Sequence, residues 1–303
     1  MKRKILCVGK SSLAVSLPRE FVELYDLKQG EEIDIKQQGS SLIIKAENTS
    51  SSTKIIDLHD FSVSEDPKKI LDKIIGALFR QGMNSFTLKC NNETTRNMIR
   101  EIINSGKLNM YEAASADSSL SITIRSSITH FDETELESMV ESIIRQIYTT
   151  FDEFLALSEE KKIKWSRVEE LVSRDKIVND QTDICKRIIN RNATSYKSTT
   201  TYSFVDKLEK IGDDVKYIML YSEKNYSAIQ KYSEMISCVK DMLFMLITAK
   251  NSFSIKKINL FFEKRNAVKS ELTKCTDVQI YSHCTDIKNR RTDAYSEMMV
   301  KSL

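Results

Sequence analysis

The stretch LEKIGDD, residues 208–214, decides how the second half of the chain folds. It lies in a helical pattern from about residue 204 to 224, where apolar residues recur three and four positions apart and mark one buried stripe. The stripe consists of Val205, Leu208, Ile211, Val215, Ile218 and Met219. Glu209 and Asp213 are four apart, so both carboxylates project from one side of the helix and repel each other unless a cation lies between them. Gly212 costs about 1 kcal/mol relative to alanine inside a helix, which indicates that another group approaches closely there.

The composition is typical of a globular protein with a substantial core. Of the 303 residues, 41% are hydrophobic and 29% are charged. The apolar runs are too short for a membrane helix or a signal peptide, so we expect no membrane insertion and a cytoplasmic location. A net charge of +3 does not indicate nucleic-acid binding through bulk charge, so such binding would require a local basic patch. The six cysteines and three histidines are scattered singly, so a zinc site built from them is not expected.

Glycine and proline divide the chain into two halves of different character. Both prolines and six of the seven glycines precede residue 107, so the remainder can be almost uninterrupted helix. This asymmetry predicts a multidomain chain of α and β structure, with β-containing domains first and an all-α domain last. The predicted domains are residues 1–48, a small α/β domain at 54–127 and a helical domain at 130–303.

Residues 1–48 read as short strands around one turn of helix. Alternating apolar and polar residues predict the strands, and Pro18 ends one of them and opens the helix. The expected strands are 4–8, 12–17, 31–36 and 41–45, and the expected helix is 19–25. Forty-eight residues bury little core alone, which favours a dimer.

The spacing of these residues resembles the AbrB/MazE/SpoVT DNA-binding domain. The shared features are VGK at residues 8–10, LAVSLPREF at 13–21, YDLKQGEEI at 25–33 and a final hairpin at 39–44. The resemblance implies a swapped-hairpin β-barrel that forms a homodimer and contacts DNA with basic residues near its N-terminus.

The basic residues of this segment support DNA binding independently. Five of them precede the first acidic residue, Glu20, and a dimer doubles their number. The candidate DNA-binding residues are Lys2, Arg3, Lys4, Lys10 and Arg19. Arg3 and Lys10 are better placed for backbone or groove contact than Arg19, which can simply begin the helix. The alternative is that these charges only make the surface soluble.

Residues 54–127 predict a β-α-β-α-β-β order. The expected strands are 54–58, 85–89, 110–114 and 119–125, and the expected helices are 68–81 and about 92–103. The segment contains neither of the glycine-rich phosphate-binding motifs, GxGxxG and GxxxxGK(S/T). It is either a spacer or dimerisation domain or a ligand-sensing domain.

From residue 129 the pattern turns helical and remains so. Six helices are expected, and they form a pair of three-helix units. Their ranges are 133–157, 161–191, 204–224, about 227–250, about 255–273 and about 278–300, with a Ser/Thr-rich break at 194–201.

This helical half resembles the PhoU domain, a phosphate-uptake regulator of two three-helix repeats. DKLEKIGDDVKYI at residues 206–218 is similar to the family's D-L-E-R-I-G-D helix, and VSRDKIVN at 172–179 is similar to its partner helix. The resemblance implies a six-helix bundle in which acidic pairs of neighbouring helices hold metal ions. The implied ligands are Asp175, Asn179, Glu209 and Asp213, although Asn179 departs from the acidic pattern and removes one charge.

The identity of the ion follows from the ligand type. Oxygen ligands favour Mg²⁺ or Ca²⁺, and the resemblance also admits iron or zinc. Ion pairs with Lys207, Lys210 or Lys216 are the alternative partners of these carboxylates.

The second half of the helical region carries basic residues where the first half carries acids. Arg265, Lys269, Arg290 and Arg291 face either an anion or acidic partner or only solvent.

Taken together, the modules resemble the AbrB–PhoU fusion proteins of prokaryotes, mainly archaea. This resemblance implies a dimeric DNA-binding regulator of phosphate homeostasis whose helical half senses or docks onto a phosphate-transport or signalling component. The alternative is a dimeric adaptor that does not bind DNA and binds a transporter or sensor kinase through its helices. We expect no enzymatic activity, because no nucleophile–base pairing or complete metal-ligand set is recognisable.

Overall fold

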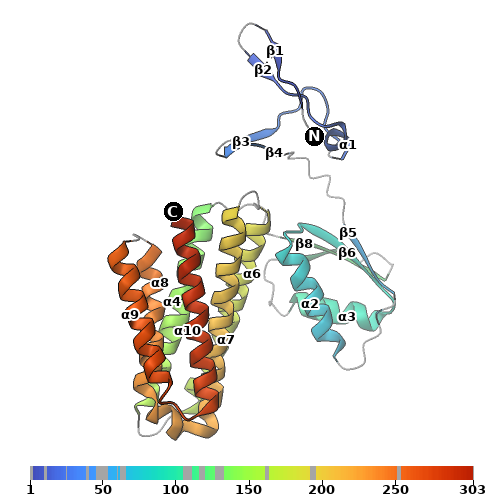
Figure 1. Ribbon diagram of the computed structural model, residues 1–303. Coiled ribbons are helices and arrows are strands. Elements are labelled where there is room, and N and C mark those ends of the chain that lie inside the picture. The colour runs from blue at the N-terminus through green and yellow to red at the C-terminus, as the bar shows by residue number, and fades with distance from the viewer. Residues whose placement is uncertain are drawn as a thin grey trace.

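The computed structural model describes most of the chain. The described residues are 3–9, 12–24, 26–38, 41–45, 54–59, 61, 66–104, 111–115, 120–126, 133–160, 164–191, 196–250 and 254–302. Small sheets lie toward the N-terminus and long helices fill the C-terminal part, which confirms a chain of α and β structure (Figure 1). None of the described helices has the length and apolarity needed to cross a membrane.

The N-terminal segment contains two antiparallel strand pairs and one short helix. The elements are β1 (Leu6–Val8), β2 (Ser12–Ala14), α1 (Arg19–Leu24), β3 (Asp34–Gln38) and β4 (Ser41–Lys45). β1 pairs with β2 and β3 pairs with β4, but these are two separate sheets, so the described part of this single chain forms no closed barrel. The barrel expected from the sequence is therefore not present in one chain, because each strand pair lacks a partner on its open edges.

The middle segment is a four-stranded sheet with two helices, in the predicted order. Its elements are β5 (Lys54–Leu58), α2 (Pro67–Arg80), β6 (Ser85–Cys90), α3 (Glu93–Asn104), β7 (Tyr111–Ser115) and β8 (Ser121–Ser126). The strand order is β5-β6-β8-β7, with β5 parallel to β6 and the other pairs antiparallel. The helices bury Leu71, Phe79 and Ile99 together with Phe86 and Leu88 of β6.

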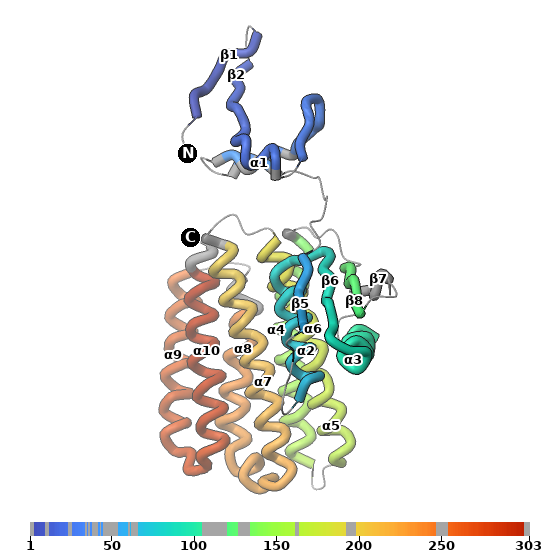
Figure 2. The backbone as a smooth tube through the Cα atoms, turned by 90° about the vertical axis from the view of Figure 1, so that its right-hand side faces the viewer, coloured from blue at the N-terminus to red at the C-terminus, as the bar shows by residue number. Residues whose placement is uncertain are grey.

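Seven helices, rather than six, make up the described part of the helical half. They are α4 (Glu133–Ser158), α5 (Trp165–Ser173), α6 (Asp175–Arg191), α7 (Tyr196–Lys231), α8 (Ser233–Lys250), α9 (Ile255–Leu272) and α10 (Val278–Ser302). The long helices lie side by side in one bundle (Figure 2). The predicted helix 161–191 is divided because the Arg174 amide bonds the carbonyl of Leu171, three residues back, in a tighter turn.

The third predicted helix is much longer than its pattern indicated. α7 includes most of the Ser/Thr-rich segment expected to be a break, because Thr201 and Phe204 are buried and packing outweighs weak helix propensity. Its predicted end at residue 224 coincides with a kink at Asn225, where φ is −131°, and a second helical segment continues from there to Lys231. The Asn225 side chain donates to the Tyr221 carbonyl at 3.3 Å, the acceptor that its own amide would use in a regular helix.

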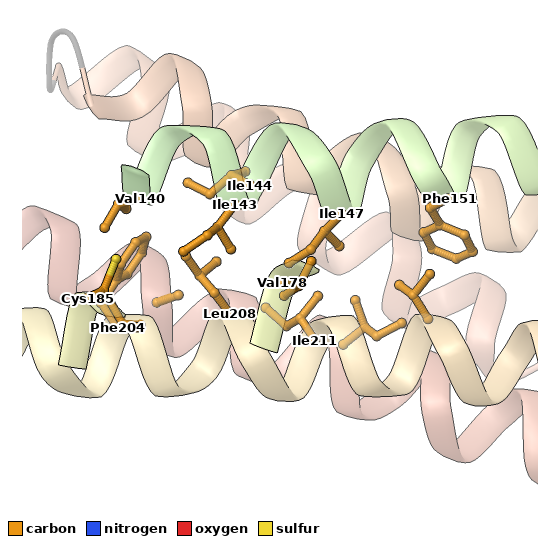
Figure 3. Packing of buried hydrophobic residues seen from close by; sticks show 14 of the residues in the cluster. Val140, Ile143, Ile144, Ile147, Phe151, Val178, Cys185, Phe204, Leu208 and Ile211 are labelled. Carbon is orange, nitrogen blue, oxygen red and sulfur yellow. The ribbon is translucent and has the colours of Figure 1, made fainter. Parts of the chain in front are cut away.

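Gly212 explains how closely α6 and α7 approach. A Cβ atom at this position would lie 3.3 Å from Cγ1 of Val178 on α6 and 3.8 Å from Cδ1 of Ile147 on α4. Figure 3 shows Ile147, Val178 and Ile211 converging at this level of the core. The predicted close approach is confirmed, and the approaching groups are the apolar side chains of Val178 and Ile147 together with Oδ1 of Asp175 at 3.8 Å.

Candidate functional site

The N-terminal basic residues lie on an exposed surface. Arg3 and Lys4 precede β1 and are exposed, and neither forms an ion pair among the described residues. Arg19 begins α1, and its Nε atom lies 2.7 Å from Oε1 of Glu23. Lys2 and Lys10 lie outside the described residues. Arg3 and Lys4 are therefore free to contact an external anion, whereas Arg19 already has a carboxylate partner.

Apolar side chains on the same strand pairs are also exposed. Ile5 is 70% exposed, Leu13 is 72% exposed and Leu42 is 67% exposed. Burying a side chain of this size contributes about 1.5–3 kcal/mol, so covering these side chains with a second surface would stabilise the segment. A single copy of this segment thus leaves its own core incomplete.

The four predicted metal ligands lie on two adjacent helices, but a lysine lies among them. Asp175 and Asn179 are on α6, and Nδ2 of Asn179 donates to Oδ2 of Asp175 at 3.0 Å. Nζ of Lys216, on α7, donates to the same Asp175 oxygen at 2.7 Å and to Oδ1 of Asp213 at 2.5 Å. Burial alone would lower the pKa of Lys216, but the hydrogen bonds to these two carboxylates outweigh it and raise the pKa.

Glu209 is bound to a different lysine. Nζ of Lys186, on α6, donates to Oε2 of Glu209 at 2.5 Å and to Oδ1 of Asp206 at 2.9 Å. Burial would lower the pKa of Lys186, and the hydrogen bonds to the two carboxylates raise it overall. Glu209 and Asp213, one turn apart on α7, therefore have separate cationic partners, Lys186 and Lys216.

This arrangement does not fit a resident metal ion. The described residues contain no group of three or more acidic, histidine or cysteine side chains that could hold one. Oδ1 of Asp175 is buried without a hydrogen-bond partner, but the cavity beside it has a volume of only about 20 Å³, comparable to one water molecule. The lysine Nζ atoms supply the positive charge that the carboxylates need, so this geometry favours the ion-pair alternative over the metal ion that the resemblance implied.

The ion-pair alternative predicted from the sequence identified the lysine partner of Asp213 but not that of Glu209. Lys216 was among the expected partners and pairs with Asp213. Lys186 was missed because it lies on a neighbouring helix. One sequence signal could have identified Lys186. This residue lies beside Cys185 and Ile189 on the buried face of α6, where a lysine requires an acidic partner.

The basic residues of α10 do not act as one group. Arg290 is used within the bundle: its Nη1 atom donates to the Lys210 carbonyl at 2.9 Å and to Oδ2 of Asp214. Asp214 is also 3.1 Å from Nδ1 of His283. Arg290 therefore joins α10 to α7 and is not available to a ligand.

A buried arginine connects the helical bundle to the α/β segment. Arg187, on α6, is 1% exposed. Its Nη1 atom donates to the carbonyls of Phe79 and Met83 at 3.0 and 2.9 Å, and Nη2 donates to Oδ1 of Asn84 at 2.9 Å. This contact, which sequence reasoning missed, fixes α2 against α6 (Figure 1).

Comparison with known proteins bears on the N-terminal segment alone. Residues 8–52 match the family model of antidote-toxin recognition MazE, bacterial antitoxin. The match runs from the last residue of β1 through β2, α1 and β3 to β4, and it agrees with the resemblance derived from the sequence of this segment. No curated protein and no solved structure matches the chain. The PhoU resemblance of the helical half stays a prediction.

Proposed function

We propose that the protein is a non-enzymatic DNA-binding regulator that acts as a homodimer through its N-terminal segment. The observation that carries this proposal is the family match at residues 8–52, in an N-terminal segment where Arg3, Lys4 and Arg19 are exposed. The finer proposal, from the PhoU resemblance, is that the helical half senses or docks onto a phosphate-transport or signalling component.

Charge supports DNA as the ligand of the N-terminal segment. Lys2, Arg3, Lys4 and Lys10 precede every acidic residue, and Arg3 and Lys4 have no internal partner among the described residues. Each lysine or arginine that neutralises a phosphate releases counterions, so the binding constant falls as salt rises. A dimer presents two copies of this patch, and the two together carry enough positive charge to contact several DNA phosphates.

Exposed apolar residues support the dimer. Ile5, Leu13 and Leu42 are mostly exposed in one chain, and the two strand pairs have open edges. A second copy of the segment can cover the apolar side chains and pair the edges. This gives dimerisation a physical driving force and places both basic patches on one molecule.

A salt titration of DNA binding tests the proposal. We expect binding of genomic fragments that weakens steeply with salt. A plot of the logarithm of the binding constant against the logarithm of the salt concentration should have a slope of about −0.9 per phosphate contact. Replacing Lys2, Arg3, Lys4 and Lys10 together by alanine should abolish binding. The matched control removes four exposed lysines of the helical half, Lys176, Lys224, Lys256 and Lys264, and should bind DNA as the wild type does.

Absence of DNA binding at about 50 mM salt would contradict the proposal, because the electrostatic contribution is strongest at low salt. It would favour the adaptor, in which the N-terminal segment only dimerises and the helices bind a transporter or kinase. The description of the matched family refers to toxin recognition, so a toxin-like protein is a further candidate partner of that segment.

A further inference from the structure

One buried lysine differs from the others in its partners. Lys186, Lys240 and Lys288 are the buried lysines of the described chain, at 5%, 8% and 7% exposure. Lys186 pairs with two carboxylates, and Lys240 pairs with Asp152. Lys288, on α10, forms no hydrogen bond through its side chain and no ion pair with any described residue. A largely buried lysine without an anionic partner is uncommon, so this position requires an explanation.

The neighbours of Lys288 on α9 are also cations. Nε of Arg265 donates to Oγ1 of Thr292 at 3.2 Å, and the same hydroxyl donates to the Lys288 carbonyl at 2.9 Å. Thr292 is one turn beyond Lys288, so this bond holds the Arg265 guanidinium against the face of α10 that carries Lys288. Lys269 is one turn beyond Arg265 on the same side of α9 and is exposed.

A fourth positive charge lies beneath these three. Arg291 is fully buried, with Nε donating to the Ile287 carbonyl at 3.1 Å and Nη2 to Sδ of Met242 at 3.3 Å. Its Nη1 atom donates to the Val239 carbonyl. Burial lowers the pKa of Lys288, and the three neighbouring positive charges lower it further. Among the described residues, no carboxylate pairs with any of the four cations.

We propose that Arg265, Lys269 and Lys288 bind a small multivalent oxyanion, of the phosphate or sulfate class, between α9 and α10. Arg291 contributes only its charge, because it is fully buried and each of its three nitrogen atoms already donates within the bundle. The sequence had suggested Arg290 for this group, but Arg290 pairs with Asp214, and Lys288 takes its place. The proposal does not depend on DNA binding by the N-terminal segment.

The chemistry of the group selects a small tetrahedral oxyanion. Lys288 is recessed, so a small ion reaches its ammonium more readily than a broad acidic surface does. The guanidinium fork of Arg265 matches two oxygens of such an ion, and two lysine ammonium groups supply further donors. A multivalent anion offsets several positive charges at once, which a single carboxylate does not.

The test is the thermal unfolding and calorimetric titration of the full chain with inorganic phosphate and with sulfate. Chloride at matched ionic strength is the reference. A specific site predicts that the unfolding temperature rises with phosphate or sulfate concentration beyond the chloride effect. Lys288→Met and Lys269→Ala should each weaken binding about tenfold or more, as expected for losing one hydrogen bond from a charged group.

Two controls decide between this site and general screening. Lys264→Ala removes an exposed lysine from the same helix and should leave the phosphate affinity unchanged. Arg3→Ala with Lys4→Ala should also leave it unchanged, which separates the result from DNA binding. The proposal is wrong if chloride acts like phosphate, or if Lys264→Ala weakens binding as much as Lys269→Ala does. Since Lys269 is exposed, its variant keeps the test valid even where Lys288→Met does not fold.

Discussion

Replacing Arg187 by alanine should detach the α/β segment from the helical bundle. The guanidinium crosses from α6 to the end of α2, where it donates to two backbone carbonyls and one amide oxygen within 3.0 Å. It also lies 4.9 Å from the centroid of the Phe79 ring, close enough for a cation–π contact. Alanine at this position leaves all three acceptors without their charged donor.

The expected loss is large compared with a typical stability. A hydrogen bond from a charged group contributes about 1.5–3 kcal/mol, which sets an upper limit of roughly 9 kcal/mol for three. Water reaches some of the acceptors once the contact opens, so we expect a loss of about 3–5 kcal/mol. Two other described links at this surface are the Arg80–Asp183 ion pair at 3.1 Å and the hydrogen bond from Nδ2 of Asn190 to the Arg80 carbonyl at 2.7 Å. Both are at least partly exposed and compensate little.

Hydrogen–deuterium exchange measured by mass spectrometry is the appropriate assay, because it locates the change. Amides in α2 and α6 should exchange faster in Arg187→Ala, while α9 and α10 stay protected. Arg187→Lys keeps the charge but not the planar fork, so its exchange should be intermediate.

Arg167→Ala is the matched control for this variant. It breaks only an exposed pair with Glu160 at 3.9 Å and should cost less than about 1 kcal/mol. Unchanged exchange in α2 of Arg187→Ala, with a similarly small loss, would refute this reasoning.

Three further predictions concern α7. Metal analysis of the purified wild type and of Glu209→Ala with Asp213→Ala should give equal metal contents, because lysines already neutralise these carboxylates; stoichiometric metal lost in the variant would contradict this. Gly212→Val should lower the free energy of unfolding by about 1–3 kcal/mol in urea denaturation, since the added methyl groups collide with Val178; an unchanged midpoint would argue against close packing there. Burial would raise the pKa of Asp206, but hydrogen bonds from two lysines lower it overall, so its ionised form stabilises the fold above the unfolded pKa. The urea midpoint of wild type should therefore exceed that of Asp206→Asn above about pH 5 and approach it as the pH falls below about 4; a difference that persists in acid would contradict the ion pair.

The order of elements could be predicted because each element carries its own local signals. At the start of α2, Asp66 accepts a hydrogen bond from the Lys69 amide at 3.0 Å, and Pro67 occupies the first turn. Both are ordinary sequence signals for the beginning of a helix. The start of α7 lacked such signals, because its hydroxyl-rich first turns form a helix only where packing supports them.

The partners within the candidate sites could not be predicted in the same way. Lys186 lies 23 residues before Glu209, on another helix, and which faces meet depends on the assembled bundle. The same limit applies to Arg290 and Lys288, which are two residues apart on α10. Arg290 pairs with Asp214 of α7, whereas Lys288 lies near the cations of α9. Sequence position alone therefore assigned Arg290, and not Lys288, to the basic cluster.

The Arg187 contact also has a consequence for how the chain can vary. Two of its three acceptors are main-chain carbonyls, which every amino acid provides, so substitutions at Phe79 or Met83 leave those acceptors in place. The Asn84 amide, the Phe79 ring and Arg80 are the parts of this contact that depend on side chains of the α/β segment. A different α/β unit with the same backbone turn after its first helix would therefore need only these three side chains to dock onto this bundle.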